Sequence, residues 1–290
     1  MLRIRHALFH GFDRENTLVI LENTGGYEKF CIEALNNLGF KVHRANNNRV
    51  KHFIKYNGIK AKTDKIDAKS LALYGEVTYN NPQSRHKLTL YKPLSEEQET
   101  LRQAALYSQN LKTFRAALKN RFKSPGCDKM QESIKKVLDF ITDEVKIIEN
   151  DMEALMKTAD NPDLYKKYEL LQKYKGVGKI TAMELMTFLP ELGELDKKYV
   201  VALSGLAPYA NDSGTLRGYR STKGEGRGRP AVRRVLFMAT LSSTRYNKEL
   251  SAYYDKKLNQ GKRKMVAMTA CMRKMIVHLN AIVKRGEILY

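Results

Sequence analysis

Between residues 130 and 155, apolar side chains repeat with the period of a coiled coil. They recur at alternating steps of four and three: Met130, Ile134, Val137, Ile141, Val145, Ile148, Met152 and Leu155. This spacing predicts a heptad seam on one long helix. Before it, Ser95 and Gln98 have the spacing of a capping box that begins another helix, and Ser124-Pro125-Gly126 ends that helix. We therefore expect a helical hairpin, whose seam pairs either internally or with a second copy of the chain, because periodicity does not fix the partner.

A shorter pattern precedes the hairpin. The apolar run at residues 17–22 stops at Glu22 and a Gly-Gly turn, which predicts a buried strand. A helix over about 27–38 and a second strand over 40–43 should follow, and this alternation indicates a mainly parallel sheet. The next helix is expected to start with Thr63 or Asp64 as its N-cap. The fold class is therefore α/β plus all-α, with the sheet in the first part.

After about Tyr168 the pattern is again helical. Gly176 and Gly178 lie between two predicted helices, as in a helix-hairpin-helix that presents backbone amides to a phosphate, although an ordinary tight turn has the same spacing. A glycine-rich loop follows, interleaved with arginines, and Pro230 then suits the first turn of a helix. A last helix is expected from about Lys262. We divide the chain into 1–92, a truncated α/β domain; 93–160, a hairpin connector; and 161–290, a C-terminal helical domain.

Charge narrows the class of partner. The chain of 290 residues has 52 Lys and Arg against 31 Asp and Glu, a formal net charge of +21. Residues 196–290 hold 20 of these basic residues and 6 of the acidic ones, so a surplus of 14 lies in the last third. A field of this kind favours nucleic acid, because each neutralised phosphate releases counterions. The alternative is a merely basic protein.

Composition excludes other classes. The three cysteines, Cys31, Cys127 and Cys271, are odd in number and far apart, which argues against a disulfide framework or a Cys-paired zinc site. No leader-like segment opens the chain, and we expect no membrane helix. These features predict a protein of the reducing cytosol.

Two sets of residues could carry chemistry. Asp64 and Asp67, three apart on a helix, project from one face and could bind Mg²⁺ together with Glu22 at the end of the first strand. The alternative is a solvated helix whose carboxylates pair with nearby lysines. Ser213, followed by Gly214 in the basic glycine loop, is either an ordinary turn residue or a nucleophile whose phosphodiester the arginines would hold.

These motifs together resemble a known family. Leu21-Glu-Asn-Thr-Gly-Gly-Tyr27 and Lys62-Thr-Asp-Lys-Ile-Asp-Ala68 are similar to the acidic motifs of the DEDD transposases of insertion-sequence family one hundred and ten, which are relatives of the Piv/MooV invertases. Asp212-Ser-Gly-Thr215, with the segments 205–208 and 229–240, is similar to the C-terminal serine domain of that family. The run 267–274 resembles its branch one-one-one-one. The resemblance covers the chain from about residue 17 to its end.

The resemblance implies a fold and a mechanism. The fold would be a partial RuvC-like, RNase H-type domain, a coiled-coil hairpin, and a C-terminal helical serine domain with a helix-hairpin-helix-like element. The mechanism would use Ser213 as the nucleophile on DNA and Glu22, Asp64 and Asp67 as catalytic acids that bind magnesium. The implied partners are DNA, a structured guide RNA and further copies of the chain in a dimer or tetramer, with no membrane. The nucleic-acid contacts would be Lys62, Lys65, Lys175, Gly176, Gly178, Lys179, Arg217, Arg220, Lys223, Arg227, Arg229, Arg233 and Arg234.

One departure from the family pattern leads to a further expectation. The first acid of the family, on a strand well upstream of Glu22, has no counterpart here. Either the true start lies upstream or this is an N-terminally truncated copy. In both cases we expect the chain to bind nucleic acid with a strong salt dependence and to recombine DNA weakly or not at all. Two other functions stay open: a non-catalytic nucleic-acid-binding remnant of a transposase, and a metal-dependent nuclease or Holliday-junction resolvase that would not need Ser213.

Overall fold

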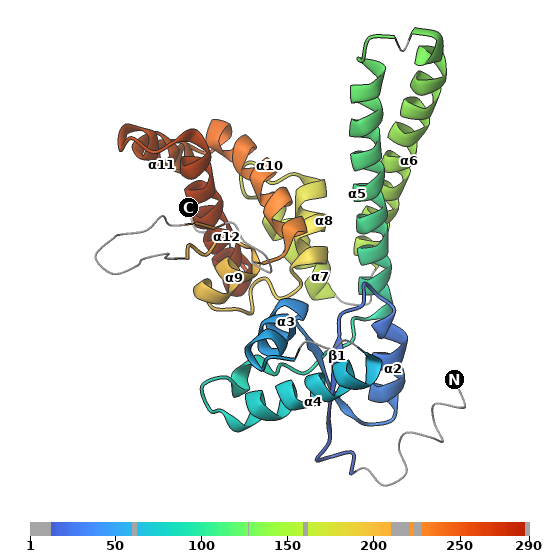
Figure 1. Cartoon of the computed structure of the whole chain (residues 1–290). Coiled ribbons are helices and arrows are strands. Elements are labelled where there is room, and N and C mark those ends of the chain that lie inside the picture. The colour runs from blue at the N-terminus through green and yellow to red at the C-terminus, as the bar shows by residue number, and fades with distance from the viewer. Residues whose placement is uncertain are drawn as a thin grey trace. The chain divides into compact units, whose positions relative to one another are not determined.

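The computed structural model describes residues 13–59, 63–126, 128–158, 162–209, 221–222 and 228–287. The chain forms two compact units, Met1–Pro93 and Leu94–Tyr290. Both units are rich in helices, and strands that form a sheet occur only in the first unit among the described residues (Figure 1). The expected class, α/β together with helical structure, is confirmed at this level.

The first unit is built on two parallel strands. Strand β1 (Leu18–Glu22) and strand β2 (Lys41–Ala45) are joined by helix α2 (Glu28–Asn37), so the expected strand-helix-strand pattern is confirmed. Leu18 pairs with Lys41 and Glu22 with Ala45, which aligns the carboxyl ends of the two strands. Functional groups in parallel sheets lie at this edge.

Helices α3 (Asn47–Tyr56) and α4 (Asp64–Asn80) complete the first unit. Thr63, one of the two expected caps, accepts a hydrogen bond from the amide of Ile66, so α4 begins at Asp64. Helix α4 packs on β1 through Gly75, where an added Cβ would lie 2.7 Å from Cγ1 of Ile20. Only a residue without a side chain allows this close packing of helix and strand.

The second unit begins with the predicted hairpin. Helices α5 (Glu96–Phe122) and α6 (Gln131–Thr158) pack along each other (Figure 1). The capping box at Ser95 and Gln98 is present with both of its hydrogen bonds. The seam on α6 is buried from Ile141 to Met152 but not at Met130, which is 62% exposed, so the internal pairing with α5 covers part of the seam.

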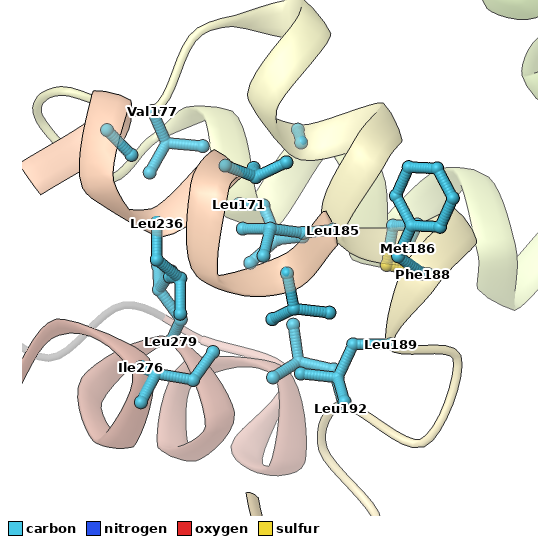
Figure 2. Packing of buried hydrophobic residues seen from close by; sticks show 14 of the residues in the cluster. Leu171, Val177, Leu185, Met186, Phe188, Leu189, Leu192, Leu236, Ile276 and Leu279 are labelled. Carbon is cyan, nitrogen blue, oxygen red and sulfur yellow. The ribbon is translucent and has the colours of Figure 1, made fainter. Parts of the chain in front are cut away.

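Six shorter helices form the core of the second unit with the base of the hairpin. They are α7 (Pro162–Gln172), α8 (Lys179–Phe188), α9 (Lys197–Leu203), α10 (Pro230–Tyr246), α11 (Lys248–Asn259) and α12 (Lys264–Arg285). Leu185 of α8, Leu236 of α10 and Leu279 of α12 are almost fully buried and converge in this core (Figure 2). Nearly all the buried apolar residues of the unit belong to this one cluster, which indicates one continuous core.

Helix α12 differs from the sequence expectation in one respect. By length and composition it could cross a membrane, and no other helix in the described ranges meets that criterion. We expected no apolar run of the roughly 20 residues that a membrane helix needs. Within the unit α12 packs against α7, α9, α10 and α11, and its Cys271 is buried and free, so it is the central core helix here.

The turn between α7 and α8 gives a test of the core. Gly176 has φ +102°, and an added Cβ would lie 2.7 Å from the Cα of Ser243 on α10, whereas a Cβ on Gly178 meets nothing within 4 Å. We expect Gly176→Ala to lower the free energy of unfolding by roughly 2–4 kcal/mol, because it combines backbone strain with a steric clash. Gly178→Ala should change it by less than about 1 kcal/mol. Urea unfolding of both variants, followed by circular dichroism, measures the difference, and equal effects would contradict this account of the turn.

Candidate active site and nucleic-acid interface

Glu22 is the last residue of β1 and is half-buried at the carboxyl edge of the strand pair. The chain then turns through Gly25 and Gly26, both with positive φ, before α2 begins. This is the strand-turn-helix geometry expected from the sequence, and it places the first predicted acid where open α/β sheets carry functional groups.

A buried carboxylate that the sequence analysis missed holds this turn. The side chain of Glu28 is 4% exposed, and its Oε2 accepts hydrogen bonds from the amide of Gly26 at 2.8 Å and from the amide and hydroxyl of Thr24 at 3.1 and 3.0 Å. Arg44 of β2 lies 3.5 Å from Oε1. Burial by itself raises the pKa of Glu28, but these hydrogen bonds outweigh it and hold the pKa at about 2.

A second contact joins the turn to α3. The amide of Asn23 donates to Oδ1 of Asn47 at 3.1 Å, and Nδ2 of Asn47 donates back to the carbonyl of Asn23 at 2.7 Å. Asn23 also accepts from the amide of Gly25. The backbone directly after Glu22 is therefore fixed from both sides, by α2 and by α3. In the sequence, the only indication of this fixed turn is Asn23 two residues before Gly25, a spacing typical of Asx turns.

Asp64 and Asp67 lie in the first turn of α4, where the helix dipole favours negative charge. Asp64 is exposed and Asp67 is half-buried. All three predicted acids belong to the described residues, and within those residues no three His, Cys, Asp or Glu side chains form a group that could hold a metal ion. The arrangement of these side chains therefore does not fit a formed magnesium site.

A cavity of about 650 Å³ lies against β1 and α4 in the first unit. Its lining includes Ile20, Lys41, Gly75, Glu76 and Arg85. None of the three predicted acids lines it, so the cavity is distinct from the edge that carries Glu22.

The predicted serine site falls outside the described residues. Lys62, Ser213, Arg217, Arg220, Lys223 and Arg227 all belong to the segments that the structure does not describe. The flanks of the Ser213 segment are described: Tyr209 and Ser221 form an antiparallel β-bridge, with backbone hydrogen bonds of 2.9 and 3.2 Å. The two described residues that flank this segment, Tyr209 and Ser221, are therefore paired with each other.

Two arginines predicted to contact nucleic acid form hydrogen bonds within the protein. Arg229 donates from Nη1 and Nη2 to the two carboxylate oxygens of Glu191 at 2.7 and 2.6 Å, and from Nη1 to the carbonyl of Phe188 at 2.9 Å. Burial by itself raises the pKa of Glu191. The hydrogen bond and the positive charge of Arg229 have the larger effect, so the pKa is lowered overall. Arg233 donates to the carbonyl of Gly205 and, at 3.1 Å, to the hydroxyl of Thr222. Spacing on a helix could not distinguish these inward-facing arginines from exposed ones.

Other predicted basic contacts are exposed. Arg234, Lys175 and Lys65 face solvent, whereas Lys179 is held by Glu153 of α6 at 3.0 Å. Gly178 is the N-cap of α8 and supplies no side-chain cap, which leaves amides of the first turn available to an anion. Ser243 donates to the carbonyl of Lys175 and so fixes the turn before α8. This geometry is compatible with the predicted helix-hairpin-helix-like element.

Two family models match the chain. Residues 5–125 match a model described as "Transposase", of the DEDD type, and residues 168–255 match one described as "Transposase IS116/IS110/IS902 family". The chain is also similar to the pilin gene-inverting proteins of Moraxella lacunata and Moraxella bovis. Each is 26% identical over 287 residues, which cover 96% of this chain and 83% of the relative.

The first match covers most of the first unit and extends through α5 of the second, and the second match lies within the second unit, in the order that the motifs predicted. They define an enzyme of DNA transposition, a recombinase that acts on DNA and is encoded by a mobile insertion sequence. The chain belongs to the IS110 family of transposases.

The buried Glu28 carboxylate predicts a pH-dependent stability. Its folded pKa of about 2 lies below the ordinary 4.5, so its contribution is present above about pH 4.5 and is lost as the pH falls toward 2. We expect Glu28→Gln to lower the free energy of unfolding by on the order of 2 kcal/mol at neutral pH and by much less near pH 2. Urea unfolding at the two pH values measures this. Glu33→Gln, an exposed change on the same helix, should have little effect at either pH, and a Glu28→Gln effect that does not depend on pH would contradict the assignment.

Proposed function

We propose that this transposase breaks and rejoins DNA through Ser213. Its Oγ attacks a phosphorus of the DNA backbone, an Oγ–P bond forms, and one P–O ester bond breaks to release a DNA hydroxyl. A hydroxyl of the new partner strand later attacks the same phosphorus and displaces the serine, so the number of phosphodiester bonds is conserved. Proton transfer accompanies each step, and nearby guanidinium groups stabilise the charge on the phosphoryl oxygens.

One observation carries the proposal. The Tyr209–Ser221 bridge closes a short segment whose sequence contains Ser213, Arg217 and Arg220. It does so in the unit that carries exposed cations such as Arg234 and Lys175. A hydroxyl and several cations in one short closed segment are the residue types that phosphoryl transfer requires.

We further propose that the first unit is a partial RuvC-like, RNase H-type domain with Glu22, Asp64 and Asp67 as its acids. IS110-family DEDD transposases generally use divalent metal ions. Magnesium binding by these three acids stays a prediction, since the described side chains do not form such a site. In our proposal the chain acts as a dimer or tetramer in the bacterial cytoplasm, near the nucleoid. There the acids of one copy serve the serine of another, and a structured guide RNA selects the DNA.

Trapping a covalent adduct tests the nucleophile. With radiolabelled DNA that carries the ends of the encoding element, and RNA transcribed from its flanks, the unchanged chain should form a small but measurable amount of denaturant-resistant protein–DNA adduct, although we expect its complete recombination reaction to be weak or absent. Ser213→Ala should abolish the adduct, because no oxygen replaces Oγ. Ser251→Ala on α11 is the matched control and should keep it. An adduct that still forms with Ser213→Ala would show that Ser213 is not the nucleophile. Cleavage without any adduct would favour the metal-dependent nuclease.

The salt dependence of binding tests the nucleic-acid interface. We expect Arg234→Gln and Lys175→Gln each to weaken binding to a fluorescent duplex and to reduce the slope of log K against log[salt] by about 1, the loss of about one phosphate contact. Lys136→Gln on the hairpin, where Lys136 pairs with the exposed Glu132, is the control and should leave the slope unchanged. A fluorescence titration at several salt concentrations measures these slopes. Unchanged slopes in all three variants would place the interface elsewhere.

A further inference from the structure

The described residues on either side of the Ser213 segment form two stems: residues 204–209 before it, and residues 221–222 and 228–229 after it. The stems touch at their bases: a Cβ added to Gly228 would lie 2.1 Å from the amide nitrogen of Gly205. The amide of Arg229 donates to the carbonyl of Leu203 at 2.7 Å. The backbones are therefore in direct contact, and Gly228, with φ +76°, permits this approach.

Arg233 joins the same two stems through its side chain. One guanidinium nitrogen donates to the carbonyl of Gly205 on the outgoing stem, and the other donates to Oγ1 of Thr222 on the returning stem. Arg233 lies at the end of the first turn of α10, a helix whose side chains Val232 and Leu236 are buried in the core. The Arg233 guanidinium therefore holds the two stems that flank the Ser213 segment at fixed positions relative to α10.

The neighbouring anchor is independent of Arg233. Arg229, directly before α10, forms a two-point ion pair with Glu191 and donates to the carbonyl of Phe188 at the end of α8. Two-point guanidinium contacts fix orientation as well as distance, and a lysine ammonium cannot reproduce them. Arg234, one residue after Arg233, is exposed, so adjacent arginines on one helix have different roles.

We propose that Arg233, together with the Thr222 hydroxyl, is a positioning residue that sets the geometry of the Ser213 segment rather than a contact to nucleic acid. This inference rests on the proposed role of Ser213. We call the contacts of Arg233 with Gly205 and Thr222 the clamp. The proposal predicts that the clamp affects the rate of adduct formation and not the affinity for DNA, because the guanidinium of Arg233 is already bonded to the two stems. A phosphate contact would show the opposite behaviour.

The experiment compares Arg233→Lys, Thr222→Val and Thr222→Ser with the unchanged chain and with Ser213→Ala. Arg233→Lys keeps the charge but cannot bridge both acceptors, and Thr222→Val removes only the accepting hydroxyl, which avoids the folding risk of a larger change. We expect both to slow adduct formation roughly tenfold to a hundredfold, as displaced reacting groups do. Duplex affinity, its salt slope and the unfolding midpoint should be unchanged. Thr222→Ser, which keeps the hydroxyl, should restore the rate to within about twofold.

A second measurement reads the stems directly. Hydrogen exchange of the Tyr209 and Ser221 amides, which pair across the stems, should become roughly tenfold faster in Arg233→Lys and Thr222→Val, with no change in the core of α12. If Arg233→Lys and Thr222→Val form adduct at the full rate while Ser213→Ala forms none, the positioning role is wrong and the nucleophile stands. If Ser213→Ala still forms adduct, the proposed function is wrong. If hydrogen exchange at Tyr209 and Ser221 is also unchanged in Arg233→Lys and Thr222→Val, the role of Arg233 in holding the stems is wrong as well. A reduced salt slope in Arg233→Lys and Thr222→Val would also overturn the positioning role.

Discussion

The close contact between Gly205 and Gly228 joins the two stretches of backbone that flank the segment containing Ser213. Because neither residue has a Cβ, two backbone segments 23 positions apart in the chain meet directly, and a side chain at Gly228 would collide with the backbone of the other stem. Arg229 and Arg233 secure this contact from the start of α10. The predicted nucleophile therefore lies in a segment whose two ends are anchored to a helix of the main core.

In the first unit, too, a charged side chain holds a turn in place, but there the charge is negative. The turn after Glu22 is organised around the buried carboxylate of Glu28, which accepts three hydrogen bonds from that turn and faces Arg44. In each unit a charged side chain satisfies backbone groups: Glu28 in the first unit, and Arg229 and Arg233 in the second. Satisfying buried polar groups stabilises a turn more than an exposed ion pair would.

Local signals predicted the elements well. The parallel strand pair, the Thr63 cap, the Ser95–Gln98 capping box and the hairpin were all expected, because each depends on residues close together in sequence. The site was less predictable. Arg229 was assigned to nucleic acid as part of the basic glycine loop and Arg233 as part of the basic helix that follows it, and Glu28 was not singled out at all. Their roles depend on Glu191, Thr222 and Thr24, partners that only packing and turn geometry bring within reach.

The sequence by itself determined the family, the order of its motifs, the positive charge and the period of each helix, because composition and spacing are properties of the chain before it folds. Tertiary structure alone decided that the seam on α6 is covered by α5 only from Ile141 onward and that the three acids do not form one group in this chain. It also decided which arginines face inward. The reason is that burial, pairing and distance depend on contacts between residues far apart in sequence, and no local pattern specifies those contacts.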